Sequence, residues 1–521
     1  MDTKALRQKI LDLAIRGKLV PQDPSDEPAS VLLEKIREEK ARMVKEGKLK
    51  KKDIKNDSII YVGDDNLHYE KFQDGTVRCI EDEIPFEVPE GWAWERLSNL
   101  AAFSGGKTPS TSHQEYWGGE VPWVTSKDMK SKYITSSQLR LSILGAEQMK
   151  MYQPDTLLLV TRSGILRHTL PVSILKEPAT INQDLKAIAL YMPQLAEYIY
   201  ICLKGMEAQL LLKYTKSGTT VENINFDEFQ KVLFPIAPLQ EIARIIAATC
   251  EAEQIVSSIE DDKTALAEYV VKAKTKILDL AIRGQLVPQN PDDEPASVLL
   301  ERIRAEKEEL IKQGKIKRDK KESVIFKGED NSYYEKIGDK VSEYATVAIR
   351  SGWSIASFSQ VNMFSSETID PSHFSEEMFE LYSVPNFELG VPEIIKGREI
   401  GSSKQSICEN DLLVCKINPR INRVWIAKHI TPYRILGSAE WMVFRNNFLF
   451  APYLQFYFSS PYFRELLLSN VSGVGGSLMR AQPESVKKYP ILIPPYEEQV
   501  RIAGKISDLF IKLDTIEKSL S

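Results

Sequence analysis

The residues from Ile10 to Lys50 read ILDLAIRGKLVPQDPSDEPASVLLEKIREEKARMVKEGKLK, and those from Ile277 to Lys317 read ILDLAIRGQLVPQNPDDEPASVLLERIRAEKEELIKQGKIK. About 30 of roughly 41 aligned positions are identical, at an offset of about 267 residues. The match continues into SIIYVGDDNLHYEK from Ser58 and SVIFKGEDNSYYEK from Ser323, each of which predicts a short β-hairpin. The chain therefore consists of two tandem units.

Weaker similarity marks the rest of each unit. VPEGWAW from Val88 resembles IRSGWSI from Ile349, and PLQEIARI from Pro238 resembles PYEEQVRI from Pro495, where proline marks the entry to a helix. The long stretches between these marks share almost nothing, which suggests a constant scaffold around two different readers. The predicted segments are an N-terminal helical region with a hairpin (1–83), a first insert (84–237), a central region with a long helix, a short helix and a hairpin (238–341), a second insert (342–494) and a C-terminal helix (495–521).

Composition and charge restrict the class of protein. The 521 residues are 43% hydrophobic and 27% charged, which is typical of a globular chain long enough for roughly three or four domains. The net charge of -5 means that a nucleic-acid surface, if present, is a local patch. We find no apolar run of membrane-spanning length and no apolar signal segment at the start. Five cysteines without a C-x-x-C pair favour a reducing, cytoplasmic location over a disulfide framework or a zinc ribbon.

The segment from Gln240 to Arg283 predicts one uninterrupted helix of about 65 Å, because it lacks proline and glycine and Gly284 follows it as a C-terminal cap. Its apolar residues repeat with heptad spacing, so that a partner helix is needed to cover the stripe. The C-terminal segment repeats the first half of this helix and the N-terminal segment repeats its second half. We therefore expect an antiparallel coiled coil in which both chain ends meet beside the central helix, with two ordinary core helices of separate domains as the alternative. The predicted seam and subunit-docking residues are Ile242, Ile245, Val256, Ile259, Leu266, Val270, Ile277, Leu6, Ile10, Leu13, Ile502 and Leu509.

Both inserts predict mixed α/β structure. The apolar runs at 157–160 and 412–414 are typical of buried strands, and 195–212 and 452–468 are typical of helices. A catalytic constellation is hard to assemble, since the sequence has no phosphate-binding G-x-x-x-x-G-K-[ST] motif and its five histidines are dispersed. The chain is therefore predicted to be non-catalytic and to bind no metal and no cofactor of its own.

Basic residues in the inserts indicate a nucleic-acid surface. The second insert has no acidic residue between Asp411 and Glu440, and its basic cluster as a group favours contact with phosphates and base edges. For each residue taken singly, a solvated surface charge is the alternative. The predicted DNA-binding residues are Lys127, Lys130, Lys132, Arg162 and Arg167 in the first insert and Lys416, Arg420, Arg423, Lys428 and Arg434 in the second.

The ILDLAIRG-x-LVPQ frame present twice, the helix entries at Pro238–Ile242 and Pro495–Gln499, and the alternation of repeated helix and divergent insert resemble the specificity (S) subunit of type I restriction–modification enzymes. In the first insert VPWVTSKDM, DTLLLVTRSG and INQDLKAI are similar to elements of target recognition domains. Gln183, in the last of these, joins the predicted DNA-binding residues. The second insert departs from the pattern, because its DLLVCKINPR lacks the R-S-G turn.

The resemblance implies an α/β (α+β) fold with internal pseudo-twofold symmetry, in which a long antiparallel coiled coil joins two mixed α/β target recognition domains. It implies that each domain reads one half of an asymmetric bipartite site in double-stranded DNA, while the helices set the spacing and dock two methylation (M) subunits. Restriction (R) subunits join that complex, and S-adenosylmethionine, ATP and Mg belong to the partner subunits of this endonuclease and adenine-specific methyltransferase. The alternatives are a structural coiled-coil adaptor holding two protein-binding modules, or a methyltransferase or nuclease with unrecognised motifs.

Overall fold

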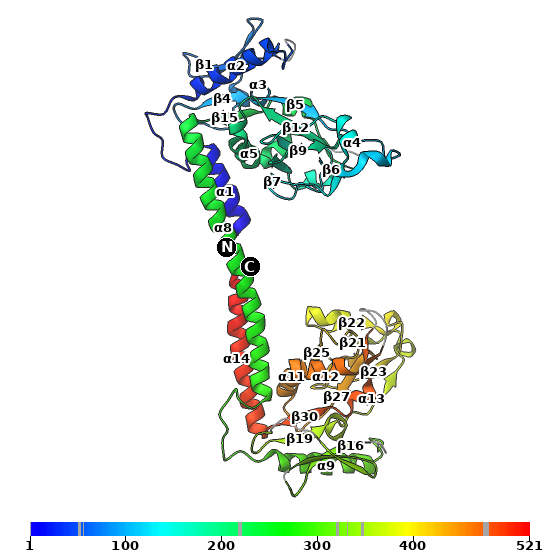
Figure 1. The fold of residues 1–521 in the computed structure, drawn as a ribbon. Helices are drawn as coiled ribbons and strands as arrows, with labels where there is room; N and C mark the ends of the chain where they lie inside the picture. Colours follow the sequence, from blue (N-terminus) through cyan, green and yellow to red (C-terminus); the bar gives the residue numbers. More distant parts are fainter. Residues whose placement is uncertain are drawn as a thin grey trace. The chain divides into compact units, whose positions relative to one another are not determined.

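The computed structural model describes residues 2–50, 54–55, 57–216, 221–318, 322–330, 332–344, 349–472 and 479–520. It divides into two compact units, Met1–Asp262 and Lys263–Ser521 (Figure 1). The division falls within the 44-residue helix α8 (Leu239–Ile282), so that each unit contains one half of this helix.

The first unit contains one copy of the repeated scaffold and the first insert. Its helices are α1 (Thr3–Ile15), α2 (Ala29–Lys45), α3 (Leu97–Leu100), α4 (Ile143–Glu147), α5 (Ala196–Gly205), α6 (Glu207–Tyr214), α7 (Phe226–Phe229) and the first half of α8. Its strands are β1 (Ser58–Val62), β2 (His68–Phe72), β3 (Val77–Cys79), β4 (Ala93–Arg96), β5 (Ala101–Gly105), β6 (Trp117–Val124), β7 (Tyr133–Ile134), β8 (Leu139–Leu141), β9 (Leu157–Val160), β10 (Val172–Leu175), β11 (Thr180–Ile181), β12 (Leu185–Leu190), β13 (Thr215–Lys216), β14 (Asn223–Ile224) and β15 (Leu233–Ile236).

The second unit repeats this order of scaffold and insert. Its helices are the second half of α8, α9 (Ala296–Lys312), α10 (Phe358–Val361), α11 (Ala451–Ser459), α12 (Pro461–Ser469), α13 (Pro483–Val486) and α14 (Tyr496–Leu520). Its strands are β16 (Ser323–Lys327), β17 (Tyr333–Ile337), β18 (Lys340–Glu343), β19 (Ser354–Ser357), β20 (Thr368–Ile369), β21 (Met378–Tyr382), β22 (Glu393–Lys396), β23 (Lys404–Ser406), β24 (Leu412–Cys415), β25 (Val424–Ile426), β26 (Arg434–Gly437), β27 (Trp441–Phe444), β28 (Val471–Ser472), β29 (Arg480–Ala481) and β30 (Pro490–Ile493).

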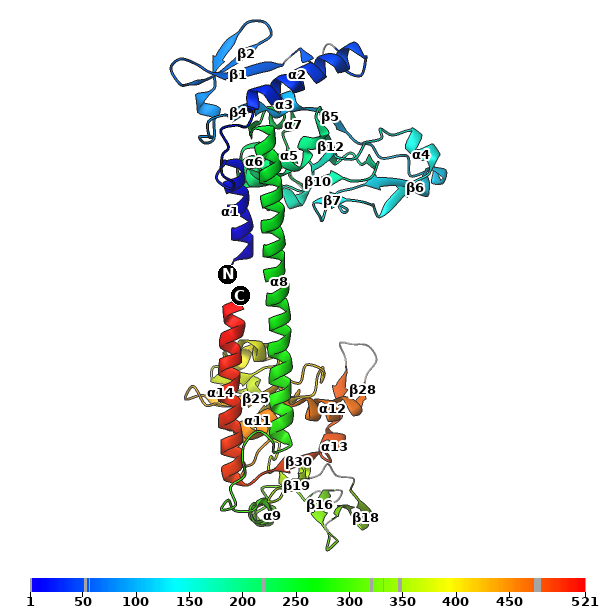
Figure 2. The same cartoon turned by 60° about the vertical axis from the view of Figure 1, so that its left-hand side comes forward.

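In the first unit, α1 lies antiparallel beside the first half of α8 (Figures 1 and 2). Near the start of α1, the Arg7 guanidinium donates to Glu253 at 3.0 Å and to Glu260 at 2.5 Å. Further along α1 the contacts move toward the start of α8, where both helices contribute to one buried core through Leu11, Ala14, Ile15, Ile242 and Ile245. The predicted antiparallel pairing is confirmed here.

In the second unit, α14 lies antiparallel beside the second half of α8 (Figures 1 and 2). The Lys274 ammonium contacts Asp514 at 2.6 Å and Glu517 at 3.0 Å, late in α14. Early in α14, the buried residues shared with the end of α8 are Leu278, Ala281, Ile282, Ile502, Ala503 and Ile506. Each half of the central helix therefore has its own short partner, as the heptad pattern predicts.

Glycines in the left-handed region end α1 and α8. Gly17 has φ +63° and Gly284 has φ +65°, and the next N–H, of Lys18 or Gln285, bonds back into the last helical turn at 2.8 Å. A methyl group on Gly17 would lie 2.5 Å from the Cγ of Pro89. The glycine of the repeated A-I-R-G therefore ends the helix. It also lets the segment that enters each insert approach the end of that helix closely.

Each predicted hairpin is present, with a third strand added. β1–β2–β3 and β16–β17–β18 are antiparallel sheets in which Ser58 pairs with Phe72 and Ser323 with Ile337. The sequence did not predict β3 or β18, because β3 has three residues and β18 four, all exposed.

Short antiparallel strand pairs close each insert at its base. β4 pairs with β15 in the first unit and β19 pairs with β30 in the second. Between β4 and β15 lie a five-stranded sheet of order β5-β12-β9-β10-β7 and a three-stranded sheet of order β11-β6-β8. Between β19 and β30 lie sheets of order β20-β23-β26-β21-β22 and β25-β24-β27. The mixed α/β class is thus confirmed, while the two inserts use their strands differently.

The two helices predicted within the inserts are each broken into two. α5 and α6 are separated at Met206, which leaves the helical region with ψ 7°. α11 and α12 are separated at Ser460, which is extended with ψ 153° because Pro461 follows it. Apolar periodicity continues across both breaks, so the pattern alone did not reveal them. Across the described part of the chain, no helix combines the length and the apolarity that crossing a membrane requires.

Candidate nucleic-acid interface

A buried tryptophan–glutamate pair ties each insert to the coiled coil. The indole N–H of Trp92 donates to Glu241 at 2.9 Å, and that of Trp353 donates to Glu498 at 3.1 Å. Each tryptophan lies just before β4 or β19, and each glutamate lies in the first turn of α8 or α14. Because both partners are buried, the base of each insert is held in a fixed place on its helix.

An ion pair repeats beside each tryptophan–glutamate pair. Arg244 of α8 contacts Asp26 at 2.5 Å, and Arg501 of α14 contacts Asp293 at 2.5 Å. Both aspartates lie in the segment that connects a coiled-coil helix to α2 or α9. The scaffold of each unit therefore uses the same residues for the same contacts.

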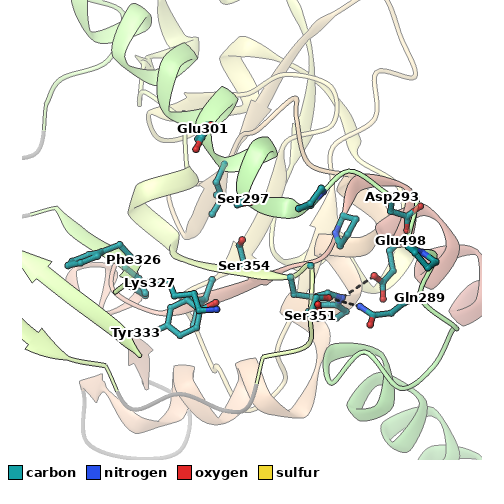
Figure 3. A pocket seen from close by; sticks show the side chains of 18 of the residues that line it. Gln289, Asp293, Ser297, Glu301, Phe326, Lys327, Tyr333, Ser351, Ser354 and Glu498 are labelled. Atoms are coloured by element: carbon teal, nitrogen blue, oxygen red, sulfur yellow. Dashed lines mark hydrogen bonds between the residues drawn. The ribbon is translucent and has the colours of Figure 1, made fainter. Parts of the chain in front are cut away.

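The two scaffolds differ at one glutamine. In the first unit, Gln22 donates to the second carboxylate oxygen of Glu241 at 2.9 Å. In the second unit, Gln289 donates to the Ser351 carbonyl at 2.7 Å instead, beside a cleft of about 700 Å³ (Figure 3). The Oε1 atom of Glu498 has no hydrogen-bond partner among the described residues. Burial raises the pKa of both glutamates.

Three segments of the first insert meet where β9 ends, and together they are named the first edge: residues 161–163, 182–184 and 222–224. The Thr161 N–H donates to the Asp184 carbonyl at 2.9 Å, and the Ile224 N–H donates to the Thr161 carbonyl at 2.9 Å. Arg162 and Asn223 face each other as an antiparallel bridge. Three distant segments of sequence are thus joined by backbone hydrogen bonds, while the side chains of Arg162, Gln183 and Asn223 are exposed to solvent.

The second insert has an equivalent set where β24 ends, named the second edge: residues 416–418, 438–440 and 479–481. The Lys416 N–H donates to the Glu440 carbonyl at 2.9 Å, and the Ala481 N–H donates to the Lys416 carbonyl at 2.9 Å. Ile417 and Arg480 form the antiparallel bridge. The two edges therefore share a backbone arrangement although their sequences do not align by eye.

The predicted lysines of the first insert differ in their surroundings. Lys127 and Lys130 are exposed in the segment after β6. Lys132 is half-buried, contacts Glu197 at 2.6 Å and lies over the Tyr200 ring. Burial opposes the charge on Lys132, but the hydrogen bond and charge of Glu197, together with Tyr133, outweigh it and raise the pKa of the ammonium group. Lys132 therefore anchors α5 to β7, which leaves Lys127 and Lys130 better suited to meet phosphates.

The predicted arginines of the first insert also differ. Arg162 is exposed on the first edge, and no ion pair or side-chain hydrogen bond joins it to the residues that the structure describes. Arg167 lies five residues on and contacts Glu222 at 2.5 Å. Gln183 is exposed on the first edge, and its side-chain oxygen accepts from the Thr108 hydroxyl.

The basic cluster of the second insert is spread over several elements. Arg434 begins β26, contacts Glu377 at 2.7 Å and lies 4.3 Å from the Phe374 ring. Arg423 is half-buried and contacts Glu388 at 3.4 Å. Of the remaining residues, Lys416 is half-buried on the second edge, whereas Arg420, between β24 and β25, and Lys428, after β25, are exposed. The shortage of acidic residues along this stretch of sequence is therefore offset by glutamates from elsewhere in the insert.

The predicted seam residues form a graded interface. Buried residues are Ile10, Ile242, Ile245, Val256, Val270 and Ile502, and half-buried ones are Leu6, Leu13, Ile259, Ile277 and Leu509. Leu266 departs from the expected seam, since it is 41% exposed. It lies between Glu260, which pairs with Arg7 of α1, and Lys274, which pairs with Asp514 and Glu517 of α14.

Among the residues of the edges that the sequence did not single out are Asn223 and Arg480. Both lie on two-residue strands, which are too short to give a periodic signal. The sequence did contain one indication of their equivalence. Asn223 precedes Pro238 by the same number of positions as Arg480 precedes Pro495. Counting back from the repeated helix entries would have aligned them.

Comparison with known proteins identifies relatives along nearly the whole chain. The family model of the type I restriction modification DNA specificity domain matches residues 89–261. The chain is 24% identical to the type I restriction enzyme EcoEI specificity subunit of Escherichia coli, over 99% of this chain and 90% of that one. It is 25% identical to the EcoAI specificity subunit of the same organism, over 97% and 88%.

A solved structure has the same fold. It is a chain from a type I restriction–modification system studied for complex assembly and conformational transition, with a TM-score of 0.51 and 13% identity. The match covers 84% of this chain and 94% of that one. With a repeated scaffold, two divergent inserts and these relatives, the chain is similar along nearly its whole length to type I restriction enzyme specificity subunits.

Proposed function

We propose that this chain is the DNA-reading subunit of a type I restriction–modification complex, in which each insert reads one half of an asymmetric bipartite site. The observation that carries the proposal is the pair of edges, which share backbone hydrogen bonds but not side chains. A pair of inserts held on equivalent scaffolds is suited to binding two similar but non-identical stretches of duplex DNA.

The proposed contacts divide into two kinds. Lys127 and Lys130 in the first insert and Arg420 and Lys428 in the second are exposed and suit the phosphate backbone, which fixes position without reading sequence. Arg162 and its neighbours on the edges suit base edges in the major groove. Lys132, Arg167, Arg423 and Arg434 hold the inserts together through their carboxylate partners and contribute to DNA binding mainly by positioning.

The repeat supports the proposed partners. Two equivalent scaffolds offer two equivalent docking places, which suits two copies of one partner, the methylation subunit, with restriction subunits joining that complex. Catalysis, S-adenosylmethionine, ATP and Mg are assigned to these partners, and the complex acts in the cytoplasm. The unpaired apolar positions of α8, Leu266 among them, are available to such a partner.

Exchange of one insert tests this function. Residues 84–237 are replaced by the corresponding insert of another specificity subunit, and methylated adenines are mapped in cells that carry the complex. We expect one half of the methylated sequence to change and the other half to stay. The reciprocal exchange of residues 342–494 is the control and is expected to change only the other half. A change in both halves after either exchange, or in neither, would contradict the proposal.

A further inference from the structure

The two edges can be aligned residue by residue through their backbone hydrogen bonds. The Ser163 N–H donates to the Glu222 carbonyl at 3.1 Å, and the Asn418 N–H donates to the Met479 carbonyl at 2.9 Å. The bonds of Thr161 and Lys416 described above follow the same pattern. Position 162 of the first edge therefore occupies the same place in the backbone frame as position 417 of the second, and position 223 the same place as position 480.

The remaining segment of each edge aligns in the same way. The Asn182 N–H donates to the Val124 carbonyl at 3.0 Å, and the Ser438 N–H donates to the Tyr382 carbonyl at 3.1 Å. In both cases the acceptor ends a strand that runs parallel to the strand before the donor. Position 183 is therefore equivalent to position 439.

Three equivalent positions thus carry different side chains on the two edges. The first edge presents Arg162, Gln183 and Asn223, all exposed. The second edge presents Ile417, Ala439 and Arg480, of which the isoleucine is half-buried and the other two are exposed. One backbone frame therefore displays hydrogen-bonding groups at three positions in one insert and at a single position in the other.

The frame around these positions is rigid. A methyl group on Gly106 would lie 2.1 Å from the Ile181 carbonyl oxygen, so only glycine allows the segment carrying Thr108 to reach Gln183. On the second edge, Arg480 contacts Glu440 at 3.0 Å, which restrains the guanidinium. The side chains of Gln183 and Arg480, held in place before binding, lose less entropy on binding, and a defined geometry is needed to distinguish base edges.

We propose that positions 162, 183 and 223 of the first edge, and positions 417, 439 and 480 of the second, determine which bases each insert selects. The inference rests on the proposed DNA-reading function and names the residues that perform it. Arginine pairs with guanine and asparagine or glutamine with adenine, whereas isoleucine and alanine offer only apolar contact, as to the thymine methyl. The half-site of the first insert is therefore read mainly by hydrogen bonds, and that of the second through Arg480 and apolar contacts.

Grafting one set of side chains onto the other edge tests the proposal. Variant R162I/Q183A/N223R carries the second set on the first edge, and variant I417R/A439Q/R480N carries the first set on the second edge. The full chain, in the complex that it forms in its host, is used to select duplexes from a random pool. Each graft is expected to change the preferred bases in one half of the selected sequence by roughly tenfold or more and to leave the other half unchanged.

Lys213→Ile is the matched control, because it removes an exposed cation on α6 of the same insert that belongs neither to the first edge nor to the predicted DNA-binding residues. It is expected to leave the selected bases unchanged. If a graft lowers the melting temperature, the variant Arg162→Lys is tested in its place. Lysine keeps the positive charge but lacks the two parallel N–H donors of the guanidinium. That variant is expected to keep its affinity for random DNA and to lose about tenfold in selectivity at one base pair.

The outcomes separate the two levels of the argument. Sequence-selective binding by the unmodified complex, with no change of preferred bases in any folded graft or in Arg162→Lys, overturns the assignment of these positions and leaves the DNA-reading function standing. Absence of sequence-selective binding by the unmodified complex overturns the proposed function and the assignment with it.

Discussion

The indole nitrogen of Trp353 donates to one carboxylate oxygen of Glu498 at 3.1 Å, while the other oxygen has no hydrogen-bond partner among the described residues. Glu498 is 1% exposed. Burial disfavours the charged carboxylate and raises the pKa of Glu498 above the usual 4.5. The contact that fastens the second insert to α14 therefore depends on pH.

A pH series tests this dependence. Because the folded chain holds the Glu498 proton more tightly than the unfolded chain, the contribution of Glu498 to stability is largest at low pH and falls as pH rises from 4.5 through the folded-state pKa. We expect Glu498→Gln to remove that part of the dependence. The measurement is the difference in melting temperature between the unmodified chain and the variant, from about pH 5 to about pH 8. Glu497→Gln, on the exposed side of the same turn, is the control, and an unchanged difference across the series would contradict the expectation.

Gly17→Ala is expected to destabilise the first unit by roughly 3 kcal/mol or more, because it adds left-handed strain to an overlap with Pro89. Gly47→Ala is the matched control, since Gly47 has φ +73° and nothing within 4 Å of the added methyl. Strain alone should then cost about 1 kcal/mol. Thermal unfolding and hydrogen exchange of the α1 amides measure both variants. Equal effects of the two substitutions would show that the close approach at Pro89 is unimportant.

Lys130→Ala is expected to weaken DNA binding, whereas Lys132→Ala is expected to lower stability. Loss of the exposed Lys130 should weaken DNA binding about equally for all sequences and reduce the slope of log affinity against log salt by about 1. Loss of Lys132 leaves the half-buried Glu197 with only its longer ion pair to Lys176 at 3.5 Å, so it should lower the melting temperature of the insert. Salt titrations of binding and thermal unfolding separate the two effects. If Lys132→Ala instead reduced the slope of log affinity against log salt by about 1 and left the melting temperature unchanged, Lys132 would be a phosphate-binding residue and not a positioning one.

The scaffold could be predicted from the sequence because each of its features appears twice. The antiparallel pairing of α1 and α14 with α8 followed from identical residues at an offset and from heptad spacing, both of which are local patterns. The inserts could not be predicted in the same detail. Their strands are often two to four residues long, and α11 and α12 look like one helix until Ser460 is placed.

The candidate interface shows the same limit. Whether a lysine meets solvent or a carboxylate depends on residues distant in sequence, as with Lys132 and Glu197. Charge clusters in the sequence therefore did not distinguish exposed basic residues from those paired with carboxylates. Asn223 and Arg480 became recognisable only through the backbone bonds that join them to Arg162 and Ile417.

The continuous helix α8 leads to a prediction about the recognised site, which rests on the proposed function. Inserting four residues between Glu251 and Thr264 adds about one helical turn, or roughly 6 Å, and rotates the C-terminal half of the helix by about 40°. Since one base pair of duplex DNA rises about 3.4 Å, the spacer between the two half-sites is expected to lengthen by one or two base pairs while both half-sites keep their sequences. Mapping methylated adenines in cells carrying the variant measures the spacer directly. Because α8 spans the division between the units, an unchanged spacer would mean that its length does not set the separation of the half-sites.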